Sequence, residues 1–228
     1  MRTRLVSLIL WGSLSALALP APARAAQVGG LVAPLGTLGF AVSGGLSYGE
    51  RDVKGGPADE VSTRRMVARA QIGLADDLDV YVLLGFSDAR FGGGGFDGTL
   101  GDSVGLGVRK GVLRYPESAM RVVLDLQGEY VRTNDGSKRI RHQGYHASAY
   151  VVHEMGAAGR TGYVYPYGGL RISYTRYDGS GGVDDYRGED TVGIFGGADY
   201  FVNPQVFFTG EVHIFDETSL YLGVGYRF

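Results

Sequence analysis

The chain has 228 residues, including 39 glycines, 15 tyrosines and no cysteine, with 20% charged residues and a formal net charge of −2 at pH 7. This length suits one domain or two small ones. The lack of cysteine excludes a disulfide scaffold, a thiolate metal site, a cysteine nucleophile and a lipoprotein anchor, and the charge argues against nucleic-acid binding.

The first 25 residues have the features of a secretory signal peptide. Arg2 and Arg4 precede an apolar stretch from Leu5 to Leu19, and Ala23-Arg24-Ala25 matches the small-x-small pattern of a cleavage site. The apolar stretch is shorter than the roughly 18–20 residues that a spanning helix needs. We therefore expect residues 1–25 to be removed on export, which leaves residues 26–36 as a periplasmic N-terminal lead.

The remaining sequence alternates apolar and polar residues in segments of about ten, separated by polar or glycine-rich breaks. This spacing places the two sets on opposite faces of a strand. In the last segment, for example, apolar residues at the even positions from Leu220 to Phe228 alternate with Tyr221, Gly223, Gly225 and Arg227. Ten segments follow the pattern: Leu38–Tyr48, Arg65–Leu74, Val80–Phe86, Val104–Arg109, Arg121–Tyr130, Tyr145–Glu154, Val164–Tyr174, Val192–Tyr200, Val206–Ile214 and Leu220–Phe228.

A soluble β-sandwich and an outer-membrane barrel can both produce such alternation. The apolar faces carry no charge, the polar faces carry arginines and carboxylates in near balance, and long breaks alternate with short ones, as in outer-membrane barrels. The long breaks are Glu50–Val61, Asp88–Gly101, Arg132–Gln143 and Tyr177–Glu189, and the short ones are Ala75–Asp79, Leu113–Ser118, Gly156–Gly162 and Val202–Pro204.

These features predict an all-β fold: an antiparallel up-and-down transmembrane barrel over residues 37–228, with about ten strands. Eight strands remain possible if the segment at Ser103–Val112 or the one around His146 is misread. The outward aromatics fall into two belts, as expected at the two membrane interfaces. Tyr48, Phe86, Tyr130, Tyr145 and Tyr174 belong to the long-loop rim, and Phe40, Tyr200, Tyr226 and Phe228 belong to the short-turn rim.

The charged residues on the polar faces are expected to form a network in the lumen. They can neutralise one another and plug the barrel, as in barrels of about eight strands, or line a narrow path for ions. The members of the network are Arg65, Arg69, Arg109, Arg121, Asp125, Glu129, Glu154, Arg171, Asp199, Glu211 and Arg227.

The C-terminus resembles the assembly signal of bacterial outer-membrane barrels, with Leu222, Val224, Tyr226 and the final Phe228 on one face. The pattern of the whole mature chain resembles small opacity-type and OmpA/Ail-like barrels. This resemblance implies insertion into the outer membrane by the barrel-assembly machinery, with outer-membrane lipid and lipopolysaccharide as further partners.

Two arrangements suggest an enzyme. His146 and Ser148 lie two apart on one strand face with Glu154, and this His-x-Ser pair resembles that of outer-membrane lipid A deacylases. However, the pair is expected to face inward, and Ala149 replaces the usual asparagine. His213 and Asp216 could form half of an omptin-like protease site, but a second acidic pair is not apparent.

The remaining motifs have simpler interpretations. The Gly-x-Gly-x-x-Gly match at Gly93–Gly98 has no helix after it to bind phosphate. The acidic loop residues Asp178, Asp184, Asp185, Glu189 and Asp190 are expected to be solvated rather than to bind calcium. His142, His146 and His153 fall on different faces or in a loop, so no metal site or cofactor is predicted.

The sequence therefore predicts a monomeric outer-membrane barrel that acts in envelope structure or in surface interactions such as adhesion, through its long loops. The alternative is a porin-like pore for ions or small solutes, and a hydrolase is the third hypothesis. No ligand or extracellular partner can be identified from the sequence.

Overall fold

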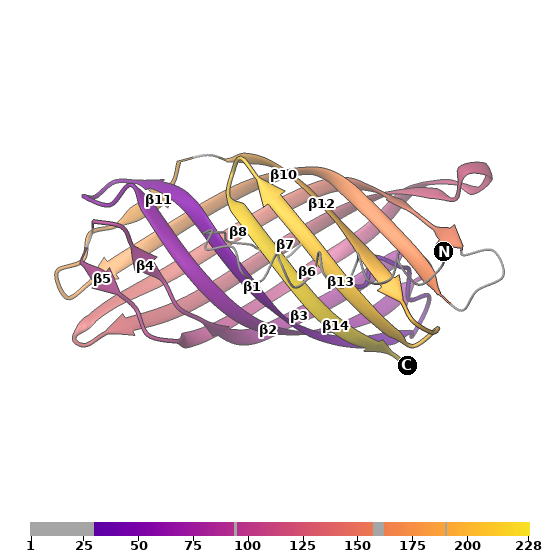
Figure 1. The fold of residues 1–228 in the computed structure, drawn as a ribbon, viewed down its shortest axis with the longest axis horizontal. Helices are drawn as coiled ribbons and strands as arrows, with labels where there is room; N and C mark the ends of the chain where they lie inside the picture. The colour runs from indigo at the N-terminus through magenta and orange to yellow at the C-terminus, as the bar shows by residue number, and fades with distance from the viewer. Residues whose placement is uncertain (1–29, 94, 157–161, 190) are drawn as a thin grey trace, which may run out of the picture.

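A computed structural model describes residues 30–93, 95–156, 162–189 and 191–228, and in it ten long antiparallel strands form a barrel (Figure 1). The strands are β1 (Phe40–Lys54), β2 (Glu60–Ala75), β3 (Leu78–Ser87), β6 (Gly101–Tyr115), β7 (Met120–Asp135), β8 (Lys138–His153), β10 (Tyr163–Ser180), β12 (Val192–Phe201), β13 (Val206–Ile214) and β14 (Thr218–Arg227). Among the described residues the one helical turn is η1 (Pro116–Ser118), and none of them form a helix long and apolar enough to cross a membrane.

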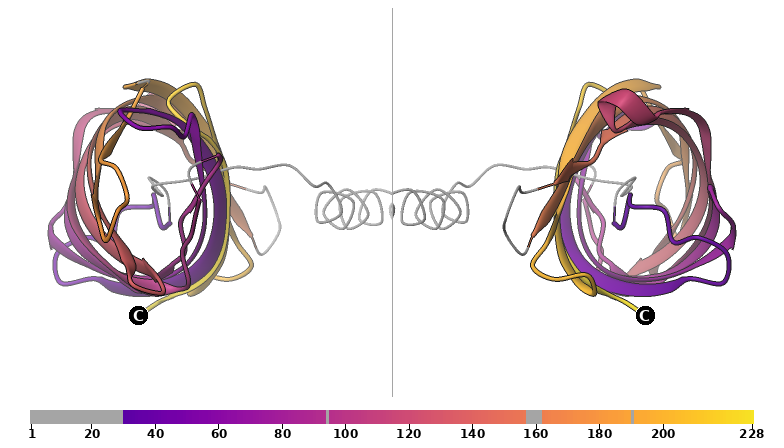
Figure 2. Two further views of the ribbon diagram at one scale, coloured as in Figure 1. Left: turned by 90° about the vertical axis from the view of Figure 1, so that its left-hand side faces the viewer. Right: turned by 90° about the vertical axis from the view of Figure 1, so that its right-hand side faces the viewer.

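The barrel closes because β1 pairs with both β2 and β14. The β1–β14 ladder runs without interruption from Ala41 opposite Arg227 to Glu50 opposite Thr218. Views along the barrel show the resulting ring of strands (Figure 2). The predicted all-antiparallel barrel of about ten strands is confirmed, and the eight-strand alternative is wrong because all ten alternating segments form strands.

The two ends of the barrel differ. At the terminal end, β1 begins and β14 ends, and the Phe228 amide donates to the Phe40 carbonyl at 2.9 Å. At the opposite end, here called the loop end, lie the β1–β2, β7–β8 and β13–β14 connections. Pro166 lies three residues after the terminal-end start of β10, where its missing N–H costs the ladder least.

Two of the predicted long loops are mostly strand. β7 extends to Asp135 and β8 begins at Lys138, so the predicted loop Arg132–Gln143 is a hairpin with a tight turn at Gly136 and Ser137. Residues 50–61 likewise extend β1 and β2 up to a turn at residues 55–59. Both hairpins continue beyond the apolar part of the barrel, because antiparallel pairing satisfies the hydrogen bonds of backbone groups that a loop would leave unpaired.

Small strands complete the loop end: β4 (Arg90–Phe91), β5 (Phe96–Asp97) and β11 (Tyr186–Gly188), whereas β9 (Met155–Gly156) lies at the terminal end. β11 pairs with both β1 and β10, above the shorter strands β12, β13 and β14. Inward apolar side chains of these segments form one buried group, the loop-end cluster. It consists of Val53, Ala58, Val61, Ala89, Phe91, Phe96, Ile140, Tyr177 and Tyr186.

The two faces of each strand have the predicted environments. Outward leucines such as Leu46, Leu106 and Leu126 are 55–70% exposed, whereas inward arginines such as Arg109 and Arg171 are at most 1% exposed. An apolar outer surface around a buried polar interior is the arrangement of a barrel that spans a membrane.

Inward aromatic side chains lie over inward glycines of neighbouring strands. The Tyr81 ring covers Gly107, where an added Cβ would lie 2.2 Å from the ring. Tyr221 in the same way leaves no room for a side chain at Gly45 or Gly223. These inward glycines therefore make space for large rings inside a narrow barrel.

We predict that Gly107→Ala lowers the free energy of unfolding by about 1–3 kcal/mol, because the Tyr81 hydroxyl is bonded to Asp125 at 2.7 Å and its ring cannot move freely. Gly128→Ala is the matched control, since its Cβ would be an ordinary 3.7 Å from Tyr145. Urea unfolding in detergent micelles measures both variants. Equal stability of the two variants would contradict this packing.

Candidate functional site

The interior of the barrel is the candidate site, and a segment that precedes β1 enters it. Residues Gly30–Leu35, here called the N-terminal strap, lie inside the terminal half of the barrel, and Leu31, Val32 and Ala33 are each 1% exposed. The strap packs on inward side chains that include Tyr150, Phe195 and Phe207. The expectation that residues 26–36 form a periplasmic lead is therefore wrong for the part that the structure describes, because residues 30–35 lie inside the terminal half of the lumen.

Inward polar side chains hold the strap by its backbone. Arg109 Nη1 donates to the Leu31 carbonyl at 2.7 Å, and Arg69 Nη1 donates to the Gly30 carbonyl at 3.1 Å. Arg121 donates to the Val32 carbonyl, and the Val32 amide donates to Asp199 Oδ2 at 2.6 Å. Hydrogen bonds to charged groups are stronger than neutral ones, so they offset the cost of burying these backbone groups.

A second layer of charge lies between the strap and the loop-end cluster. Four residues, here called the charge cluster, form it: Arg51, Arg171, Asp216 and Glu217. Arg171 Nη2 lies 2.6 Å from Asp216 Oδ2 and 2.8 Å from Glu217 Oε1, and Arg51 Nη2 lies 2.6 Å from Glu217 Oε2. All four side chains are at most 3% exposed.

The short β13–β14 connection delivers both acids to the cluster. Phe215 adopts a φ of +82° and is 69% exposed, whereas Asp216 and Glu217 turn inward. Gly193 makes room for Asp216, because a Cβ there would lie 1.8 Å from Asp216 Oδ1. Burial alone would raise the pKa of the Glu217 carboxyl, but Arg171 and Arg51 outweigh burial and hold this pKa below its usual range.

Smaller networks surround the charge cluster. Arg65 Nη2 donates to Glu129 Oε2 at 2.8 Å, and Arg109 Nε donates to Asp125 Oδ2 at 3.0 Å. Glu211 accepts from the Tyr167 hydroxyl at 2.9 Å and lies 2.6 Å from His213 Nε2. The partners in these networks lie on the same strand or on strands at most three apart in the sheet, so charges on one part of the wall satisfy one another inside the lumen.

The structure buries nine of the eleven residues of the predicted lumen network, which are Arg65, Arg69, Arg109, Arg121, Asp125, Glu129, Arg171, Asp199 and Glu211. Glu154 instead lies exposed at the terminal end, where it accepts from the Tyr165 hydroxyl at 3.3 Å. Arg227 is half-buried there and lies 3.5 Å from the Leu35 carbonyl. The prediction is therefore wrong for Glu154. This residue keeps the inward parity of Val152, because β9 continues the β8 register against β10, but it lies beyond His153 at the mouth of the barrel, where it is exposed.

The prediction missed Arg51, Asp216, Glu217 and the strap. Arg51 lies in the predicted long break Glu50–Val61, and the two acids lie in the short connection between the last two alternating segments. Only the spacing of these residues could have indicated that they are buried. Arg51 has the same inward parity as Ser47 on β1, and the connection that holds Asp216 and Glu217 is only three residues long.

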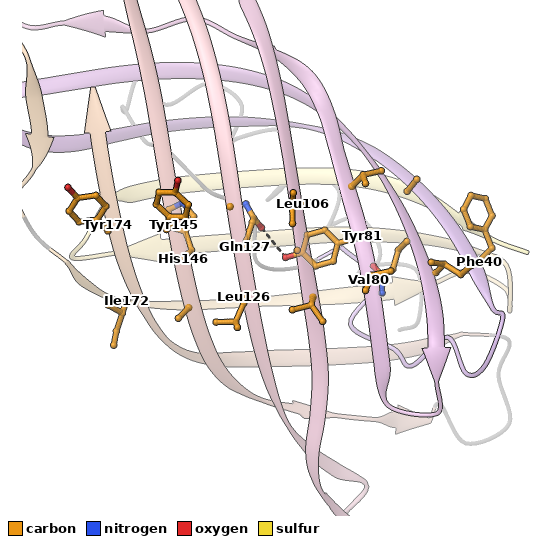
Figure 3. A pocket seen from close by; sticks show the side chains of 18 residues that line it. Phe40, Val80, Tyr81, Leu106, Leu126, Gln127, Tyr145, His146, Ile172 and Tyr174 are labelled. Carbon is orange, nitrogen blue, oxygen red and sulfur yellow. Dashed lines mark hydrogen bonds between the residues drawn. The ribbon is translucent and has the colours of Figure 1, made fainter. Parts of the chain in front are cut away.

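One cavity lies on the outer wall of the barrel. It measures about 950 Å³ and forms an apolar furrow along neighbouring rows of outward side chains, from Phe40 to Tyr145, Ile172 and Tyr174 (Figure 3). Within the barrel, a cavity beside Arg51, Glu129 and Glu217 measures about 20 Å³, enough for about one water molecule. A cavity of about 290 Å³ lies at the terminal mouth beside Pro34.

The residues of the two enzyme hypotheses do not assemble as those hypotheses require. His146 Nδ1 lies 3.0 Å from Ser173 Oγ rather than bonding Ser148, and Glu154 is at the terminal end. Ser173 in turn donates to Asp216 at 2.7 Å, so the serine separates the acid from the histidine. His213 and Asp216 are at most 1% exposed inside the barrel rather than at its rim.

The other motifs do not converge on a ligand site. In the part of the chain that the structure describes, no group of three or more histidines and carboxylates is placed to hold a metal ion. Asp178 is an ion-pair partner of Arg176, and Asp185 accepts from the Gly179 amide at 2.8 Å. Gly93 and Gly95 lie in the connection between β4 and β5.

The C-terminal residues of the predicted assembly signal form an outward apolar row at the seam of β1 and β14. Leu222, Val224, Tyr226 and Phe228 are 36–69% exposed. The Phe228 ring lies 4.8 Å from the Tyr226 ring and 5.4 Å from the Phe40 ring, measured between centroids.

No protein-family model matches the chain, and no curated protein matches it. Solved structures similar to it are outer-membrane barrels. OprG from Pseudomonas aeruginosa is 14% identical over 86% of this chain and 98% of its own, with a TM-score of 0.37. Ail from Yersinia pestis is 14% identical over 84% and 99%, with a TM-score of 0.36. An outer membrane channel from Pseudomonas putida F1 is 11% identical over 89% and 100%, with a TM-score of 0.44. The similarity is one of fold alone.

We predict that Arg171→Gln lowers the free energy of unfolding by about 3–5 kcal/mol, because it leaves Asp216 and Glu217 buried with too little positive charge. Arg139→Gln, which alters an exposed arginine on β8, should change stability by less than about 0.5 kcal/mol. Urea unfolding in micelles compares the two variants. Equal losses would show that the charge cluster does not stabilise the barrel.

We also predict that the strap shields the terminal half of the lumen from water. Thr209 lies beside Asp199 and is buried. The cysteine of a Thr209→Cys variant should react with a small charged thiol reagent only when residues 26–35 are deleted. A cysteine in Ser173→Cys, above the strap, should stay unreactive in both backgrounds. Reaction of Thr209→Cys in the chain that keeps the strap would contradict a docked strap.

Proposed function

We propose that this chain is a sealed outer-membrane barrel whose role depends on its outer surface and its loop end rather than on transport through the lumen. This assigns it to envelope structure or surface interaction. The observation that carries the proposal is that three successive layers fill the interior. They are the N-terminal strap, the charge cluster with its surrounding ion pairs, and the loop-end cluster.

The chemistry of the layers supports a plug. A conducting pore needs charged or polar groups that remain free to meet water and ions. Here the buried arginines and carboxylates meet one another at 2.6–3.0 Å, and the cavity among them holds about one water. At the loop end the filling is apolar, and ions would have to lose their hydration to pass it.

The proposed orientation places the loop end outside the cell and the terminal end in the periplasm. Outer-membrane barrels have short periplasmic turns, as between β2 and β3, where only residues 76 and 77 separate the strands. The export signal expected in residues 1–25 agrees with this placement. The extended β7–β8 and β1–β2 hairpins would then project from the surface, where an external partner could meet them.

The alternative function is a narrow pore for ions or small solutes. It would require the strap and both layers above it to move together. The strap is the most separable of the three, because its described residues join the wall only through hydrogen bonds, packing contacts and the chain at β1. We propose no enzymatic role, since the buried Ser173 and His146 leave no space for a substrate between them.

We predict that the purified protein gives no steady single-channel steps in planar bilayers. Liposomes that contain it should exclude small sugars as protein-free liposomes do, because the filled interior blocks them. A general porin from the same membrane preparation serves as the positive control. Reproducible conductance steps from the unaltered chain would overturn the sealed-barrel proposal and favour the pore.

A further inference from the structure

Three outward arginines lie side by side on neighbouring strands at the loop end. Arg132 is on β7, Arg141 is on β8 and Arg176 is on β10, and all three are exposed. We refer to these three residues as the arginine patch. They share the outward face with the belt tyrosines Tyr130, Tyr145 and Tyr174, which are 37–58% exposed.

The strand register sets the height of the patch above the tyrosine belt. Arg132 and Arg176 lie two residues beyond Tyr130 and Tyr174 toward the loop end, and Arg141 lies four residues beyond Tyr145. With a rise of about 3.3 Å per residue and a tilt of about 40°, the three arginines lie about 5–10 Å above the belt. This is the depth of the headgroup layer, which adds about 5–8 Å to each side of the hydrocarbon core.

The arginine patch carries more positive charge than its neighbouring carboxylates offset. Arg132 and Arg141 are directly opposite each other across the β7–β8 ladder, and like charges in this position repel. Asp102 lies 3.6 Å from Arg132, and Asp178 lies 2.5 Å from Arg176. Asp178 is also directly opposite Arg141 across the β8–β10 ladder, although no carboxylate lies within 4 Å of Arg141 among the described residues. Three arginines therefore have two carboxylates as neighbours. An external anion would relieve the repulsion.

Three adjacent outward arginines occur at this height on β7, β8 and β10, whereas on β2 the exposed Arg64 lies over the Tyr48 ring. At a similar height on β1, the outward residues are Glu50 and Asp52. A ligand attracted by the patch is therefore anionic and is held at β7, β8 and β10.

The apolar furrow ends directly below the patch. Tyr145 and Tyr174, the belt residues under Arg141 and Arg176, line its loop-end limit, and Leu106, Leu126 and Ile172 continue it toward the membrane centre (Figure 3). A shallow groove of about 950 Å³ that begins beneath three arginines fits a molecule with an anionic head and long apolar chains.

We propose that the arginine patch and the furrow together bind a phosphorylated glycolipid of the outer leaflet, lipid A, with its phosphates on the arginines and acyl chains in the furrow. Guanidinium groups donate two parallel hydrogen bonds to a phosphate, which suits Arg132 and Arg141 as a pair. This inference rests on the proposed outer-membrane placement and is independent of whether the lumen is sealed.

The test is titration of the detergent-solubilised full-length protein with lipid A, followed by native mass spectrometry in the presence of EDTA. The double variant R132Q/R141Q should bind bisphosphorylated lipid A at least tenfold more weakly than the unaltered chain. Arg114→Gln is the matched control, because Arg114 is exposed at the opposite rim and pairs with Asp77. Its affinity for lipid A should not change.

Two ligands identify the chemistry. Removal of both phosphates from lipid A should reduce binding as much as the double substitution does. Phosphatidylglycerol, which has one phosphate and two chains, should bind at least tenfold more weakly than lipid A. Equal binding of phosphatidylglycerol would overturn the assignment to lipid A, and equal binding by R132Q/R141Q would overturn the patch itself.

Arg141→Gln alone keeps the test valid if the double variant does not fold. Arg141 is exposed and has no carboxylate partner, so its loss should not affect the mobility shift of the folded barrel on unboiled gels, yet it should weaken lipid A binding about threefold or more. Unchanged affinity of this folded variant would also overturn the proposal. The conductance measurement stays a separate readout, so the two proposals can fail independently.

Discussion

The closed ring of backbone hydrogen bonds is the constraint on which the rest of the structure depends. In hydrocarbon an unpaired backbone group costs several kcal/mol, so the pairing of β1 with β14 is as necessary as any hairpin. Closure gives every strand one face toward lipid and one toward a narrow interior. Charges that face inward have little water to meet, so each must find a partner in the protein. Arg171 meets this requirement by pairing with Asp216, and Arg69 and Arg109 meet it by donating to backbone carbonyls of the strap.

The sequence could predict what depends on local alternation. The ten strands, their inward and outward faces, and the burial of Arg109 or Arg171 all follow from a period of two. Contacts made between distant segments could not be predicted. The sequence of residues 30–35 does not indicate that the Val32 amide bonds to Asp199, 167 positions away, because the strap has no alternating pattern of its own. The burial of Glu217 could not be predicted either, because a short polar connection ordinarily faces water, whereas here Phe215 takes the outward position and the acids turn inward.

The interior and exterior of the barrel have different consequences for function. Inside, rings over glycines, paired charges and the strap use the available space, and the proposed sealed role rests on this filling. Outside, the surface is not uniform: one side offers arginines above tyrosines and an apolar furrow, and another offers carboxylates on β1. Lipid A bound on one side, as proposed, would hold the projecting hairpins in a fixed orientation relative to the membrane surface. This links the wall of the barrel to the surface role that its loop end suggests.

The alternation of lipid-facing and interior side chains is the central claim, and tryptophan quenching by brominated lipids tests it most directly. The only tryptophan, Trp11, lies in residues 1–25, so a protein that begins at Ala26 has no background signal. Val82→Trp and Tyr81→Trp place the probe on adjacent residues of β3, one 48% exposed and the other 3% exposed. In vesicles brominated along the acyl chains, we predict strong quenching for Val82→Trp and weak quenching for Tyr81→Trp. Equal quenching at the two positions would contradict the account.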